Sequence, residues 1–167
     1  MRSKFYKNER AFFNMSAADR LIEAKNDLKE LGYGIIIYDA YRPWFVTKMF
    51  WEGTPENLKH FVANPENGSS HNKGCAIDIG LYDIETGESI VMISGYDEFT
   101  ERAYPNYMGG SKKQRDIRDM LIQVMERNDF TVYEYEWWHF NYNQCDSGIM
   151  NYSSEELDSC LLYTSDA

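Results

Sequence analysis

The chain has 167 residues, 43% of them hydrophobic, which is enough for one hydrophobic core and too little to suggest two. Its formal net charge of −10 argues against a nucleic-acid partner, because binding to a phosphate backbone relies on Lys and Arg side chains that displace counterions. The same charge gives no attraction to an anionic membrane surface, and no segment reaches the roughly 18 apolar residues of a membrane span. We therefore expect a single globular domain without nucleic acid and without membrane insertion.

The first part of the chain predicts two helices on either side of a strand. A capped amphipathic segment predicts a helix that begins at Ser16 and stops at Gly32. The β-branched run at 34–41 is typical of a buried strand. Pro43 suits the first turn of a second helix, which we expect to end near Gly53. These elements alternate without any repeat or low-complexity linker between them.

The rest of the chain predicts a small sheet and a third helix. The expected elements are a loop or short helix at 54–68, a strand at 75–82, a return strand at 89–93, a long loop at 94–110, a helix at 112–128 and a last strand at 131–140. On the third helix we interpret the basic residues Lys112, Lys113, Arg115 and Arg118 as a solvated face. The fold class that follows is α+β, with helices packed on a small antiparallel sheet.

The cysteines and the two ends of the chain say little about function. Cys75, Cys145 and Cys160 are an odd number without CxxC spacing, so we expect neither a disulfide framework nor a thiolate metal site, and we expect Cys75 to be a small buried residue. The N-terminal stretch lacks the apolar run of a signal peptide, which predicts a cytoplasmic location. We interpret residues 160–167, CLLYTSDA, as a translated sequencing adapter, and we assign the domain to residues 1–159.

Two polar clusters interrupt these apolar elements. Asp78 lies inside an apolar strand, seven residues after His71, and a buried carboxylate is costly unless it is paired or binds a metal. Glu136 and His139 lie in the last predicted strand, where a regular pleat would point them to opposite faces, so the chain must bend or bulge there for both to reach one site. His71, Asp78 and His139 would together supply the three nitrogen and oxygen ligands of a catalytic zinc site, with Glu136 left free as a base.

Three separated motifs then match a known pattern in the same order along the chain. They are Tyr-Arg-Pro at 41–43, Ser-x-His-x-x-Gly-x-Ala-x-Asp at 69–78 and Glu-x-x-His at 136–139. Together they resemble the VanX-type D-alanyl-D-alanine dipeptidases, zinc peptidases that share a fold with D,D-carboxypeptidases, certain phage endolysins and the signalling domain of hedgehog. The resemblance extends from about Ala17 to Phe140. It implies a hedgehog-like D,D-peptidase fold and hydrolysis of the D-alanyl-D-alanine dipeptide to free D-alanine.

The resemblance also implies a role for each matching residue. One Zn²⁺ would be bound by His71, Asp78 and His139. Glu136 would take a proton from the metal-activated water and return it to the leaving amine, and Arg42 would stabilise the oxyanion, for which a permanent cation with several donors is well suited. Asp97 would contact the free amino group of the dipeptide, and Ser69 would lie at the substrate pocket.

Three other functions fit the same residues. A D,D-carboxypeptidase or endolysin-like peptidase acting on longer peptidoglycan stems would use the same ligands without recognising a free amino group. A zinc-stabilised binding domain would need neither Glu136 nor Arg42, so the presence of both argues against it. An inactive truncated fragment is the third possibility. The sequence distinguishes neither antibiotic resistance from cell-wall recycling nor one oligomeric state from another.

Overall fold

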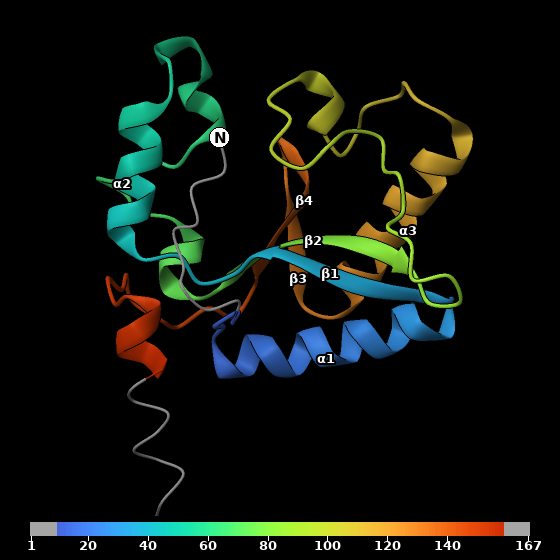
Figure 1. Cartoon of the computed structure of the whole chain (residues 1–167), viewed down its shortest axis with the longest axis horizontal. Helices are drawn as coiled ribbons and strands as arrows, with labels where there is room; N and C mark the ends of the chain where they lie inside the picture. Colours follow the sequence, from blue (N-terminus) through green and yellow to red (C-terminus); the bar gives the residue numbers. More distant parts are fainter. Residues whose placement is uncertain (1–9, 159–167) are drawn as a thin grey trace, which may run out of the picture.

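A computed structural model describes residues 10–158, which form an α+β fold around one antiparallel sheet (Figure 1). The strands pair in the order β1-β2-β4-β3, and each neighbouring pair is antiparallel. The elements, in chain order, are α1 (Met15–Glu30), β1 (Tyr33–Asp39), α2 (Trp44–Gly53), the 3₁₀ turns η1 (Glu56–Phe61) and η2 (Ser70–Lys73), β2 (Ala76–Asp83), the 3₁₀ turn η3 (Glu101–Ala103), α3 (Lys112–Arg127), β3 (Phe130–Tyr133) and β4 (Glu136–Tyr142). The predicted fold class is confirmed.

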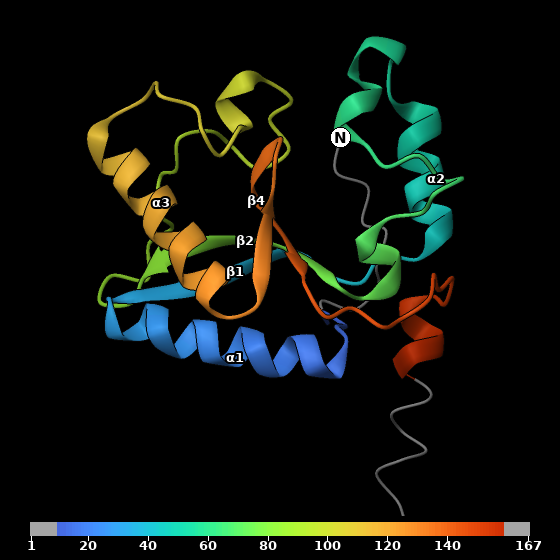
Figure 2. The ribbon, with the colours of Figure 1, turned by 180° about the vertical axis from the view of Figure 1, so that it is seen from behind.

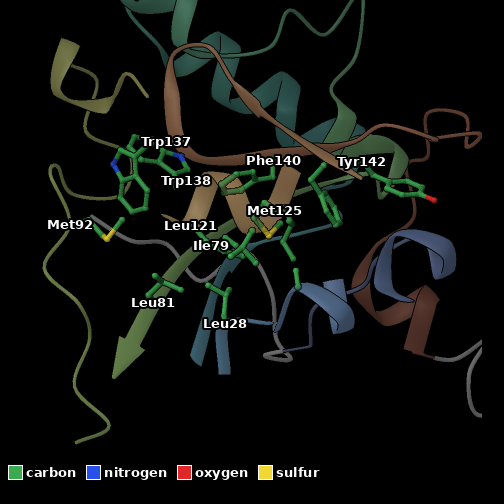
Figure 3. Close-up of a cluster of buried hydrophobic side chains, with 14 of the residues drawn as sticks. Leu28, Ile79, Leu81, Met92, Leu121, Met125, Trp137, Trp138, Phe140 and Tyr142 are labelled. Carbon is green, nitrogen blue, oxygen red and sulfur yellow. The ribbon is translucent and has the colours of Figure 1, made fainter. Parts of the chain in front are cut away.

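One face of the sheet carries the hydrophobic core. Helices α1 and α3 pack on that face. Helix α2 and the turn η1 stand apart from α3 (Figure 2). Alternate residues of β2, Ile77, Ile79 and Leu81, point into the core together with Leu28 of α1 and Leu121 of α3 (Figure 3). Burial of each such aliphatic side chain contributes about 1.5–3 kcal/mol. The residue between two of them, Asp78, therefore faces the opposite side of the sheet.

The predicted helices are present, with small differences at their ends. Asn14, and not Ser16, caps α1, because its side-chain oxygen accepts a hydrogen bond from the Ala17 amide at 3.2 Å. Gly32 follows the helix with a φ of +88°, a conformation that glycine adopts without strain. At the start of α3, Ser111 and Gln114 form a reciprocal capping box.

The strand predictions for residues 34–41 and 89–93 need correction. Strand β1 is an edge strand and not a buried one, since Ile37 is 44% exposed. The predicted return strand at 89–93 does not form. After the turn, the chain pairs with β2 only through a single bridge between Tyr82 and Ser89 and a hydrogen bond from the Ile90 amide to the Leu81 carbonyl. The chain then leaves the sheet and enters the long loop at 94–110.

The predicted last strand is in fact a hairpin of two strands. Residues 134 and 135 form the turn between β3 and β4, so the segment at 131–140 is not one continuous strand. Val132 of β3 pairs with Phe140, but the next residue, Tyr133, pairs with Glu136, so the register between the two strands shifts at this point. This irregularity is the bend that the sequence required, and it brings Glu136 within 3.7 Å of His139.

Arg118 does not belong to a solvated basic face. Its side chain is 3% exposed, and its guanidinium donates a hydrogen bond to the Tyr107 carbonyl at 2.7 Å and pairs with Asp119. Arg115 likewise donates to the Gly109 and Gly110 carbonyls. These hydrogen bonds from Arg115 and Arg118 hold the end of the 94–110 loop against α3, so these two residues of the basic cluster have a structural role.

Cys75 and Cys145 form a disulfide, contrary to the expectation from their spacing. Cys75 directly precedes β2 and Cys145 follows β4, and the pairing of these strands brings the two ends together, with the Tyr142 amide donating to the Cys75 carbonyl at 2.8 Å. The predicted burial of Cys75 is confirmed. The bond links the two segments that carry His71, Asp78 and His139.

We expect Cys145→Ser to lower the free energy of unfolding by about 4 kcal/mol, because the disulfide closes a loop of 70 residues and so restricts the unfolded chain. Urea denaturation of the wild type and of the variant measures this difference. A reductant should destabilise the wild type by the same amount and leave Cys145→Ser unchanged. Equal stability of wild type and variant under oxidising conditions would contradict the prediction.

Two predictions concern residues that lie partly or wholly outside the described part of the chain. The segment interpreted as an adapter, residues 160–167, lies outside the described residues, as does the start of the predicted domain. Within residues 10–158, no helix combines the length and the apolar character needed to cross a membrane.

Candidate active site

Strand pairing brings together two of the predicted site residues, Asp78 and His139, and adds a third acidic or imidazole side chain, Asp39, that the sequence did not predict. Asp39 on β1 lies opposite Asp78 on β2, and Asp78 lies opposite His139 on β4, so one row of polar residues crosses three strands. His71 approaches this row from the short turn η2. That turn is held by Ser69, whose hydroxyl oxygen accepts a hydrogen bond from the His71 amide at 3.2 Å, and it ends at Gly74 with a φ of +65°.

His71, Asp78 and His139 form a compact cluster. One nitrogen from each imidazole and one carboxylate oxygen all lie within 4.8 Å of one another. The Asp78 Oδ1 atom is 3.3 Å from His71 Nε2 and 3.0 Å from His139 Nδ1, and the two nitrogens are 3.2 Å apart. His71 and Asp78 are buried, and His139 is partly exposed. The predicted ligand atoms thus converge on one point.

The hydrogen bonds around the cluster show why a cation fits there. His71 Nδ1 lies 2.6 Å from the Ala40 carbonyl, to which it must donate, so the lone pair of a neutral ring is on Nε2. His139 Nε2 lies 3.2 Å from the Asn141 amide oxygen, which places the lone pair of that ring on Nδ1. Among the described residues, Asp78 Oδ1 is a buried oxygen without a hydrogen-bond partner. Three lone pairs therefore face each other, which is unfavourable unless a proton or a metal ion lies between them.

The pKa values of Asp78 and His71 are shifted by this close approach. Burial alone would favour the neutral acid, but the imidazoles of His71 and His139 hold the pKa of Asp78 well below its usual range. Burial opposes a charged ring at His71, yet the carboxylate of Asp78 raises the pKa of that imidazole. The pocket is thus arranged for positive charge at its centre. Two nitrogens and one oxygen are a donor set that zinc uses in catalytic sites, where a further position is left to water or substrate.

Glu136 lies beside this cluster at the start of β4. It is 8% exposed, and one of its carboxylate oxygens is 3.7 Å from His139 Nδ1. Burial raises the pKa of Glu136 to about 7, with the positive potential of His139 opposing that shift. A carboxylate whose pKa lies near neutrality is suited to accept a proton and to release it again.

Arg42 lines the same cleft and is oriented by Asp39. The Oδ2 atom of Asp39 accepts hydrogen bonds from Arg42 Nε at 2.8 Å and from Nη2 at 2.6 Å, and both side chains are about 15% exposed. Burial opposes the charge, but the carboxylates of Asp39 and Asp78 raise the pKa of the guanidinium, which stays charged. The ring of Phe50 lies 5.0 Å from the guanidinium carbon. The cation is thus held in one orientation.

All the predicted site residues line one cleft with a volume of about 990 Å³. Asp97 is exposed at its rim and has a φ of +58°, a conformation that is uncommon outside glycine and is often found at functional sites. Ser69 also lines the cleft, while its hydroxyl oxygen caps η2. Apolar side chains also line the cleft, among them Met49, Phe50, Phe61 and Phe99.

The structure adds three polar residues that the sequence reasoning missed. Asp39 pairs with Arg42, Tyr96 donates a hydrogen bond from its hydroxyl to Asp78 Oδ2 at 3.2 Å, and Asn141 faces His139. Asp39 could have been found from its position three residues before Arg42, and Asn141 from its position two residues after His139 on one strand face. Tyr96 lies in an irregular loop, so no periodicity in the sequence indicates where its side chain points.

Comparisons with known proteins agree with this geometry. The D-ala-D-ala dipeptidase family matches residues 1–156. A D-alanyl-D-alanine dipeptidase of Enterococcus faecium is 32% identical over 154 residues, which cover 81% of this chain and 75% of that protein. One of Escherichia coli is 31% identical over 142 residues, covering 85% of this chain and 72% of that protein.

The fold also has a solved counterpart. The structure of the LdcB LD-carboxypeptidase superposes with a TM-score of 0.52 at 18% identity, covering 96% of this chain and 70% of the other. At this level of identity, the match supports the predicted fold and nothing further. The sequence matches are stronger, and the cluster of two histidines and an aspartate fits the metal that these peptidases require. The chain therefore belongs to the D-ala-D-ala dipeptidase family of zinc peptidases.

Proposed function

We propose that this chain hydrolyses D-alanyl-D-alanine to free D-alanine, with zinc bound by His71, Asp78 and His139. The observation that carries the proposal is the convergence of three metal-ligand atoms with Glu136 and Arg42 in one cleft. A purely structural zinc site needs neither a base nor a fixed cation beside it. Membership of the dipeptidase family supplies the substrate class.

Each side chain has a distinct task in this proposal. When bound, zinc supplies a Lewis acid and makes water a stronger nucleophile near neutral pH. Glu136 accepts the proton of the attacking water and delivers it to the amine that leaves when the peptide bond breaks. Arg42, oriented by Asp39, donates N–H groups to the oxygen that becomes negative in the transition state.

Recognition of the free dipeptide is assigned to Asp97 and Ser69. Asp97 stands at the exposed rim of the cleft, where its carboxylate can pair with the ammonium group of the substrate. A carboxylate placed there favours the free dipeptide over an N-acetylated analogue, because the analogue carries no positive charge at that end. Ser69, two residues before His71, also lines the cleft and would contact the substrate there.

The test is an assay of D-alanine released by zinc-loaded protein from D-alanyl-D-alanine and from its N-acetylated analogue. We expect release from the free dipeptide alone, and its loss after chelation. Cleavage of the blocked peptide and of longer stem peptides would instead identify a D,D-carboxypeptidase, for which a cleft of about 990 Å³ has room. Zinc binding without any hydrolysis would overturn the enzymatic proposal in favour of a binding domain or an inactive fragment.

The role of Asp97 predicts a change in selectivity. Asp97→Asn should raise the KM for D-alanyl-D-alanine and reduce the preference for the free over the N-acetylated substrate, because the paired charge is gone. Steady-state kinetics on both substrates measure this. Asp146→Asn, another exposed aspartate of the described chain, serves as the control. A preference unchanged in Asp97→Asn would remove Asp97 from amine recognition.

We also propose that one domain spans residues 1–159. One hydrophobic core joins side chains between Phe13 and Cys145, which supports a single domain over that part of the chain.

A further inference from the structure

Each of the three proposed zinc ligands has a second polar atom, and each of these atoms has a partner of its own. His71 Nδ1 donates to the Ala40 carbonyl at 2.6 Å. His139 Nε2 lies 3.2 Å from Asn141 Oδ1, and Asp78 Oδ2 accepts from the Tyr96 hydroxyl at 3.2 Å. These contacts leave one atom of every ligand for the metal. Such outer contacts fix the orientation and the protonation state of metal ligands.

The contact of Asn141 selects the tautomer of His139. Both residues lie on β4, two positions apart, so their side chains point to the same face of the sheet. An amide oxygen beside Nε2 keeps the proton on that nitrogen and leaves the lone pair on Nδ1, which is the atom that faces Asp78. Without an acceptor at Nε2, the proton could equally lie on Nδ1 and block the metal.

The contact of Tyr96 selects which oxygen of Asp78 binds the metal. The phenol ring is fixed from two sides, by stacking on Tyr38 at 4.5 Å between ring centroids and by an edge contact with Trp138 at 5.7 Å. The hydroxyl is therefore placed at Asp78 Oδ2 by packing and not by chance. With Oδ2 engaged, Oδ1 is left between the two imidazoles as a single-oxygen ligand.

We propose that Asn141 and Tyr96 are positioning residues of the zinc site, Asn141 by holding His139 as the Nε2–H tautomer and Tyr96 by confining Asp78 to coordination through Oδ1. The inference rests on the ligand set of the proposed function. It concerns the affinity and geometry of the metal site, so it can be measured without substrate.

The first experiment compares the zinc affinity of Asn141 variants by competition with a chromophoric chelator. Asn141→Leu, similar in shape but without an acceptor, should bind zinc roughly 10–100-fold more weakly. Asn141→Asp keeps an acceptor and should retain tight binding. Asn143→Leu, two residues further along the chain, is the control and should bind as the wild type does. Wild-type affinity in Asn141→Leu, or equal losses in the Leu and Asp variants, would overturn the role of Asn141.

The second experiment uses Tyr96→Phe, which keeps the stacked ring and removes only the hydroxyl. We expect roughly 10–100-fold weaker zinc binding and, in the cobalt-substituted protein, a changed visible spectrum, because Asp78 can then bind through both oxygens. Tyr133→Phe is the control, since its ring lies 5.3 Å from that of His139 in the same cleft. Wild-type affinity together with an unchanged cobalt spectrum in Tyr96→Phe would overturn the role of Tyr96.

Failure of this inference can be told apart from failure of the proposed function. His71→Ala should abolish tight zinc binding if the ligand set is right. If His71→Ala binds zinc as the wild type does, the ligand set itself is wrong, and the inference falls with it. If His71→Ala loses zinc while the Asn141 and Tyr96 variants bind normally, only the positioning roles are wrong.

Discussion

Glu136→Gln should bind zinc with wild-type affinity and lose turnover by roughly 10²–10⁴-fold, the range typical of general acid–base catalysis. The substitution keeps the shape of a side chain that is 8% exposed, so the fold should tolerate it. It removes the only feature the mechanism needs from Glu136, which is the ability to carry a proton. Steady-state kinetics on D-alanyl-D-alanine, together with zinc content, measure both effects.

A neighbouring glutamate provides the control for this experiment. Glu134 lies two residues earlier, at the exposed turn between β3 and β4, and Glu134→Gln changes the same charge without touching the cleft. We expect it to keep wild-type kinetics. If Glu136→Gln turns over at the wild-type rate, another group must carry the proton. If it also loses zinc, Glu136 acts on the metal site and not as a separate base.

The pH dependence of activity should follow the ionisation of the same carboxylate. Burial raises the pKa of Glu136 to about 7 in the metal-free protein, and a bound zinc ion lowers it by favouring the anion. Because the base must be ionised, kcat/KM should rise with pH through the pKa of Glu136 and fall as the carboxylate is protonated. The acid limb should therefore lie below pH 7 in the zinc enzyme, and it should be missing from the residual activity of Glu136→Gln. An acid limb that persists unchanged in Glu136→Gln would assign the titration to another group.

Local sequence patterns point to Asp78 and Glu136 because both lie in strands, whereas His71 lies in the short turn η2 and has no such periodic signal. Asp78 stands out as a charge between Ile77 and Ile79, and such a break in an apolar run can be seen without any structure. The need for a bend between Glu136 and His139 follows equally from the pleat of a strand. Both arguments use only the neighbours along the chain.

Contacts between distant segments could not be predicted in this way. The disulfide joins residues 70 positions apart, and what brings them together is the pairing of β2 with β4, not a spacing motif. Tyr96 reaches Asp78 from an irregular loop whose course depends on side chains packed elsewhere, among them Arg118. The exposure of β1 likewise depends on its place at the edge of the sheet, since the same β-branched run would suit a central strand.

Arg42→Lys should lower kcat by roughly 10²–10³-fold while the zinc content stays unchanged, as expected for the loss of a group that stabilises a developing oxyanion. Lysine keeps the positive charge, but it lacks the planar fork through which Asp39 fixes the guanidinium with two hydrogen bonds. The charge that remains would therefore be mobile, and a mobile cation stabilises the transition state less than a fixed one.

The kinetic constants separate the two ways in which Arg42 could act. A fall in kcat at nearly constant KM shows that the guanidinium acts mainly in the transition state, whereas a rise in KM alone would show that it binds the ground state and would contradict the prediction. Arg20→Lys is the matched control, because Arg20 pairs with Glu23 on the exposed surface of α1. Asp39→Asn should reproduce part of the loss in kcat, since it leaves Arg42 in place and removes the carboxylate that orients it. Wild-type kcat in Arg42→Lys would mean that the oxyanion is stabilised without this residue.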